Sequence, residues 1–166
     1  MSRSKKRLDP SRYVPAGMGM KEQKTILGFF TAAAIAWPIM SFGTRLSDAL
    51  RDLDRYYADM MPDFYAVLGN AMLVIPIAFA AMFAMAAMHY VYHWKGSRSI
   101  YLMRRLPNRW ELHRRCLTLP ALGIAFFLIL GAAEMFIMYG IYLLAAPDGT
   151  VAPDQFEKLI ELWRVI

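Results

Sequence analysis

Two histidines of this chain have a spacing that metal or haem chemistry could use. His89 and His93 are four residues apart, so they share one face if the segment is helical. The pair could contribute to a zinc site, which needs further ligands, or one of them could ligate haem together with a histidine from a facing helix. The third histidine, His113, lies in a basic connector. We therefore expect these side chains to pack at an interface, and we predict no metal site.

A single acidic residue, Glu134, interrupts the apolar run Cys116–Ala146 near its middle. An ionised carboxylate in such surroundings is costly and needs a partner, water or a proton. Both a functional role and an interhelical hydrogen bond from the protonated acid remain open. No histidine lies at the same depth, so we expect Glu134 to meet a partner subunit or an aqueous cavity.

The densest positive charge lies in the connector RSIYLMRRLPNRWELHRR, residues 98–115, which holds six arginines and one glutamate. Apolar and aromatic side chains alternate with the arginines, and Pro107-Asn108 divides two helix-compatible parts. These features predict a short amphipathic helix and a turn, whose apolar side chains bury on lipid headgroups or in a protein groove.

Three apolar runs must position these residues, in a chain of 166 residues that is 58% hydrophobic and 19% charged. A helix needs about 20 mostly apolar residues to cross a bilayer. The fold class predicted is an all-α integral membrane protein with spans over about 25–42, 66–92 and 117–146. A soluble bundle is disfavoured, because residues 71–90 show no polar face. A cleaved signal peptide is disfavoured too, because the first run begins late.

Basic residues predict the orientation. Seven lysines and arginines lie in 1–24 and seven in 93–115, against three in 43–64 and two after residue 146. The positive-inside rule then predicts a multi-pass protein of the inner cell membrane, with its N-terminus and inner loop cytoplasmic and its C-terminus extracytoplasmic. The net charge of +6 is explained by these flanks and by anionic lipid, so no nucleic-acid partner is expected.

The remaining segments complete the predicted organisation. Residues 1–24 form a basic arm, 25–146 the transmembrane domain with its inner loop over 93–116, and 147–166 an amphipathic tail. Apolar residues at helical spacing predict a short amphipathic helix in the outer loop 44–64, and another follows Pro153 in the tail. Pro76 predicts a kink within the second span.

Within the basic connector, the order of residue types resembles the loop after the second membrane helix in permeases of the type-2 ABC exporter family. That loop has a basic residue and serine, an apolar–aromatic pair, Ser-Leu-Pro, and then arginine with an acidic or polar residue. The chain departs from this pattern at Arg105, where the family usually has serine, and its three predicted spans make it about half of such a permease. The matching residues are Arg98-Ser99, Ile100-Tyr101-Leu102, Leu106-Pro107, Arg109 and Glu111.

The resemblance implies a membrane subunit of an exporter, whose connector is the coupling element seated in an ATP-binding subunit. ATP and Mg²⁺ would bind in that partner, because this chain has no Gly-x-x-x-x-Gly-Lys-Ser/Thr motif. We expect no catalytic residue and no cofactor in this chain, and further membrane subunits as partners. The expected coupling residues are Tyr101, Leu102, Arg104, Arg105, Leu106, Pro107, Trp110 and Glu111.

Two other functions remain open. The chain could be an accessory or assembly subunit of another membrane complex, in which the basic loop only fixes topology and binds anionic lipid. It could also be an enzyme or redox protein that uses the histidines or Glu134, although no nucleophile–base arrangement is evident in the sequence.

Overall fold

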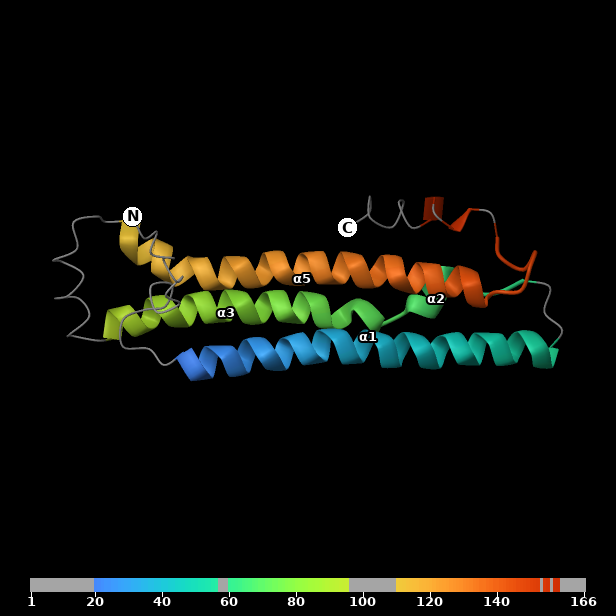
Figure 1. Cartoon of the computed structure of the whole chain (residues 1–166), viewed down its shortest axis with the longest axis horizontal. Helices are drawn as coiled ribbons and strands as arrows, with labels where there is room; N and C mark the ends of the chain where they lie inside the picture. The colour runs from blue at the N-terminus through green and yellow to red at the C-terminus, as the bar shows by residue number, and fades with distance from the viewer. Residues whose placement is uncertain (1–19, 57–59, 96–109, 153, 156, 159–166) are drawn as a thin grey trace, which may run out of the picture. The chain divides into compact units, whose positions relative to one another are not determined.

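The computed structural model describes residues 20–56, 60–95, 110–152, 154–155 and 157–158, and its secondary structure there is helical (Figure 1). The helices are α1 Met20–Tyr56, α2 Phe64–Leu68, the short 3₁₀ helix η2 Ala71–Leu73, α3 Val74–Lys95 and α5 Trp110–Ala145. Three stretches of this part are long and apolar enough to cross a membrane, namely Met20–Arg55, Ala71–Tyr92 and His113–Ala145. The predicted all-α class is confirmed, together with three helices capable of spanning.

The helices build two compact units. Of the described residues, the first unit contains 20–30, 77–95 and 110–127, and the second contains 31–56, 60–76 and those from 128 onward. Each of the three long helices contributes a segment to both, and each unit has its own buried side chains.

The core of the first unit is a stripe of buried residues along α3 and α5. The spacing is four, three and four residues on both helices, which keeps a stripe on one helical face. Gly123 allows the closest approach, because a Cβ there would lie 2.5 Å from the Met82 sulfur. The buried residues are Ala78, Met82, Met85 and His89 on α3, and Cys116, Pro120, Gly123 and Phe127 on α5.

An aromatic cluster forms the core of the second unit. The ring of Phe64 is fully buried, and its centroid lies 6.2 Å from that of Phe42, 5.2 Å from Tyr139 and 5.5 Å from Tyr142. All three ring pairs meet edge to face, the arrangement that aromatic quadrupoles favour. This cluster holds α2 between the second half of α1 and the end of α5.

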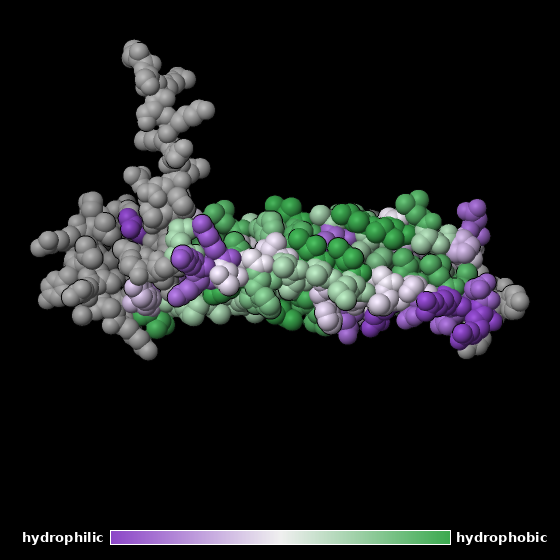
Figure 2. All heavy atoms as spheres, turned by 60° about the horizontal axis from the view of Figure 1, so that its bottom comes forward, coloured by the Kyte–Doolittle hydropathy of each residue, from purple (hydrophilic) through white to green (hydrophobic). Residues whose placement is uncertain are grey.

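Large apolar side chains remain exposed along every long helix. Ile129 is 70% exposed, Phe29 67% and Phe83 65%, and these three lie on α5, α1 and α3 respectively. On the face drawn in Figure 2, hydrophobic side chains cover the helices and hydrophilic ones gather where helices end. Exposed apolar surface of this extent is typical of a protein that contacts lipid or other subunits.

The structure corrects the predicted boundary after the first span. The sequence predicts a span over 25–42 and a separate amphipathic helix in 44–64, but α1 runs unbroken to Tyr56. Pro38 is accommodated inside the helix, and buried positions recur at spacings of three and four residues beyond it. Gly43 alone is too weak a breaker to end a helix with continuing buried contacts. The amphipathic segment is therefore the last part of α1.

The second predicted span, over 66–92, is interrupted near its start rather than kinked in its middle. α2 ends at Leu68, and the chain turns at Gly69, whose φ is 45°, and Asn70 before η2 begins. Pro76 lies in the first turn of α3, where a backbone N–H has no intrahelical partner to lose. The interruption of this span therefore lies at Gly69 and Asn70, before Pro76.

The third helix begins earlier than predicted. The sequence predicts a span over 117–146 after an inner loop over 93–116, but α3 extends to Lys95 and α5 begins at Trp110. No glycine or proline lies between residues 110 and 119, so the basic side chains join the helix. The loop is correspondingly shorter than predicted.

The tail turns at Gly149 before a helical start. Gly149 has a φ of 80°, and the N–H of Thr150 donates to the Pro147 carbonyl at 3.2 Å. Further on, the N–H of Lys158 donates to the Asp154 carbonyl at 3.1 Å, which is one helical turn. Most of the predicted basic arm and the end of the tail lie outside the described residues.

Candidate functional site

Two hydrogen bonds join α3 and α5 at the ends that flank the inner loop. His89 Nδ1 donates to the carbonyl oxygen of Cys116 at 3.0 Å, and the hydroxyl of Tyr90 pairs with Nδ1 of His113 at 2.8 Å. The Tyr90 and His113 rings are also in contact, with centroids 5.8 Å apart. We call His89, Tyr90, His113 and Cys116 the loop clamp.

Pro120 explains why the Cys116 carbonyl is available to His89. In an α-helix this carbonyl would accept the N–H of the residue four positions later, and that residue is a proline without N–H. A carbonyl without a partner in an apolar core is costly, and the imidazole N–H of His89 satisfies it. Pro120 on α5 thus removes the usual donor to this carbonyl, and His89 on α3 replaces it.

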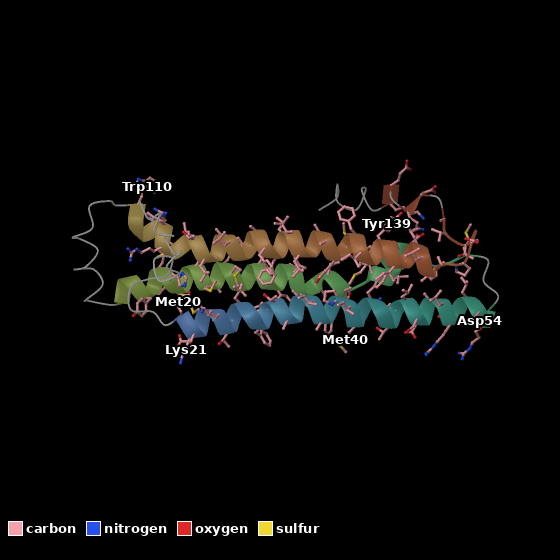
Figure 3. The ribbon with its side chains drawn as sticks, viewed as in Figure 1. Met20, Lys21, Met40, Asp54, Trp110 and Tyr139 are labelled. Carbon is pink, nitrogen blue, oxygen red and sulfur yellow. The ribbon has the colours of Figure 1, made fainter. Side chains whose placement is uncertain are left out.

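Of the predicted coupling residues, only Trp110 has a described side chain. It is the first residue of α5, is 75% exposed, and its ring centroid lies 5.9 Å from that of His113 (Figure 3). The backbone of Glu111 belongs to the same helical turn, but its side chain lies outside the described part. The other coupling residues lie in 96–109, outside the described residues: Tyr101, Leu102, Arg104, Arg105, Leu106 and Pro107.

Both described histidines contact the neighbouring helix. His89 is fully buried and His113 contacts Tyr90, while the side chain of His93 lies outside the described part. Among the described residues, no group of three or more His, Cys, Asp or Glu side chains could hold a metal ion. Cys116 is a buried free thiol.

Glu134 is buried in the second unit, opposite the interruption that precedes α3. It is 8% exposed, and its Oε2 has no hydrogen-bond partner within the described residues. One turn before it on α5, a Cβ at Gly131 would lie 3.2 Å from Ile75, and one turn after it Met138 belongs to the same cluster as Ala71. The carboxyl side chain therefore faces residues 71–75, where the backbone is only beginning its helix.

The tail is fastened to the start of α2 by side-chain hydrogen bonds. Gln155 Oε1 accepts the backbone N–H of Phe64 at 2.8 Å, and Gln155 Nε2 donates to Asp63 Oδ1 at 2.8 Å. The ammonium group of Lys158 reaches both carboxylate oxygens of Asp63 at 3.1 Å. We call Asp63, Phe64, Gln155 and Lys158 the tail latch.

Further contacts support the latch in the second unit. Met61 N–H donates to the Thr150 carbonyl at 3.0 Å, and the Tyr142 hydroxyl donates to the Pro62 carbonyl at 2.8 Å. The pKa of Asp63 lies below its ordinary value of 3.8, chiefly because the Gln155 amide donates a hydrogen bond to it and, second, because the Lys158 ammonium group does. The carboxylate is therefore ionised at neutral pH and keeps both donors.

Sequence reasoning missed the loop clamp, the latch and the burial of Gln23, which is 4% exposed. The clamp left a readable signal, because Pro120 frees the Cys116 carbonyl four residues before it. The latch left none, since Asp63 and Gln155 are 92 positions apart and both are ordinary surface residue types.

Comparison of the chain with protein-family models, with curated proteins and with solved structures finds no match.

Proposed function

We propose that the chain is a three-span membrane protein whose inner loop is the contact point for a soluble partner. Support comes from three long apolar helices and from the large apolar side chains exposed on each of them. The charge distribution supports an orientation with the N-terminus and the inner loop in the cytoplasm, in the inner cell membrane. Anionic lipid would meet the basic flanks of the spans, such as Lys21, Lys24, Arg114 and Arg115.

We further propose that the soluble partner is the ATP-binding subunit of an ABC exporter, and that the inner loop is its coupling element. The loop clamp is the observation that carries this proposal. Two interhelical hydrogen bonds tie α3 to α5 where the loop leaves them, so a force on the loop would move both helices together. ATP and Mg²⁺ would bind in the partner, and further membrane subunits would cover part of the exposed apolar surface.

An accessory role in another membrane complex is the second candidate. It is favoured by the number of helices, because three possible spans make about half of the permease that the loop resembles. In that role the basic loop fixes topology and binds lipid, and its replacement would not remove any soluble partner.

Co-purification in mild detergent tests these proposals. We expect an ATP-binding subunit to co-purify with the chain from its native membrane, and to be lost when Leu106→Asp and Trp110→Asp are combined. Met60→Asp is a matched control, because Met60 is 64% exposed but lies between α1 and α2 rather than at the loop. An ATP-binding subunit retained equally by both variants would refute the coupling role. Its absence from the wild-type preparation would favour the accessory role.

A further inference from the structure

Gln23 and His89 carry three buried polar atoms that need a partner. These are Nε2 and Oε1 of Gln23 and Nε2 of His89, none of which has a hydrogen-bond partner in the described part of the chain. Gln23 is 4% exposed and His89 0%. Buried polar atoms in folded proteins are almost always hydrogen-bonded to protein or to ordered water, so each of these atoms requires an explanation.

The two side chains lie in the same core, that of the first unit. Three residues, one on each long helix, lie at the same height along the helices, namely Leu27, Met82 and Gly123. A Cβ at Gly123 would lie 3.2 Å from Met82 Cγ and 3.8 Å from Leu27 Cδ1. α1 and α3 run in opposite directions there (Figure 1). Gln23 is four residues back along α1, about 6 Å, and His89 is seven residues on along α3, about 10 Å in the same direction.

The tilt of the side chains brings the polar atoms closer than the backbones. Side chains on a helix lean toward its N-terminus. On α1 this moves the Gln23 amide toward the level of His89, and on the antiparallel α3 it moves the His89 ring toward the level of Gln23. The Gln23 amide and the His89 ring therefore both point into the space between the height of Gln23 and the height of His89 along the helices.

The hydrogen bond from His89 to the Cys116 carbonyl determines whether His89 Nε2 is a donor or an acceptor. Because a carbonyl only accepts, Nδ1 carries the proton that is donated to Cys116, and Nε2 of the neutral ring is an acceptor.

We propose that Gln23 and His89 bind one internal water molecule, which joins α1 to α3 beneath the loop clamp. The water accepts a hydrogen bond from the Gln23 amide and donates one to His89 Nε2, and its second hydrogen reaches Gln23 Oε1 or another acceptor. A buried water with two to four such partners is a regular part of protein structure. With the bond from His89 to Cys116, one polar network then connects α1, α3 and α5.

Solid-state NMR of the full chain in lipid bilayers, with ¹⁵N-labelled histidine, tests this site. The His89 signals are assigned by their loss in His89→Asn. In the wild type we expect protonated Nδ1, an Nε2 shift typical of a hydrogen-bonded acceptor, and magnetisation transfer from water protons to Nε2. Gln23→Leu should abolish that transfer and move Nε2 toward the shift of an unbonded nitrogen.

Thr25→Val is the matched control, because Thr25 is exposed on α1 and its hydroxyl donates to Lys21 of the same helix. It should leave the His89 spectrum unchanged. Three wild-type results would overturn the proposal: an unbonded Nε2 without water transfer, a doubly protonated His89 ring, or a direct coupling between the Gln23 amide and Nε2. Because these results come from the wild type, the test does not depend on whether Gln23→Leu folds. It is also independent of any exporter function.

Discussion

Because Pro120 and His89 act on the same carbonyl, Pro120→Ala should restore stability that His89→Leu loses. In His89→Leu the carbonyl of Cys116 loses its donor while it stays buried, since Cys116 is 0% exposed. A buried carbonyl without a partner costs about 1–3 kcal/mol. Pro120→Ala then supplies the backbone N–H that an α-helix normally directs at this carbonyl. The double variant should therefore recover most of the stability lost in His89→Leu.

Reversible unfolding in bicelles or mixed detergent would give the four free energies of the cycle. We expect Pro120→Ala alone to change stability little, because in the wild type the carbonyl already has a donor and can accept a second. The coupling between the two sites should be about 1 kcal/mol or more, within the range known for residues that share a partner. Additive single effects would refute the idea that the proline and the histidine serve the same carbonyl. Thr118→Ala is a suitable background control on α5, because its hydroxyl donates to the Arg114 carbonyl of its own helix.

Glu134→Leu should raise the free energy of unfolding by about 1–3 kcal/mol in the same assay, because it removes a buried carboxyl oxygen that has no hydrogen-bond partner among the described residues. A large loss of stability would instead mean that the carboxyl group has a partner in the membrane. Gly69→Ala should destabilise by about 1–3 kcal/mol, since φ is 45° and the new Cβ would clash with the Arg45 guanidinium group. Adding Arg45→Ala should recover the part of this lost stability that comes from the clash, but not the part that comes from the positive φ. Tyr142→Phe should cost about 0.5–1.5 kcal/mol for its lost hydrogen bond, with an unchanged fold by circular dichroism. The depressed pKa of Asp63 stabilises the latch above the ordinary value of 3.8, and this contribution should vanish as pH falls through the lower folded value. Protection factors of the latch amides, which compare exchange with the intrinsic rate at each pH, measure this loss, and protection that does not fall with acid would contradict it.

The sequence predicted what depends on composition and missed what depends on single backbone groups. Three continuous apolar runs sufficed for three long helices, because length and hydrophobicity decide that outcome. Helix ends depend on finer effects, and Gly69 outweighed Pro76 because its positive φ breaks the helix whereas a proline in a first turn does not.

Of the candidate site, the sequence singled out Glu134 as an acid within a predicted span and placed His89 at an interface, but it did not predict the burial of His89 between α3 and α5. It could not supply their surroundings, because contacts between helices depend on rotation and register that periodicity leaves undetermined when every face is apolar. The same limit explains Gln23, whose burial follows from the packing of α1 against its neighbours in the first unit.

The length of α1 has a mechanical consequence. Its 37 residues reach about 55 Å at 1.5 Å each, whereas the hydrocarbon layer of a bilayer is about 30 Å thick. Even a tilted α1 would leave several turns beyond the hydrocarbon layer, and its last turns carry both aspartates and arginines. The first span would thus continue as a helix beyond the bilayer, where one face packs on the aromatic cluster and the other carries charge. A spin label at Asp54, near the end of α1 (Figure 3), would report the inclination of this part to the membrane plane.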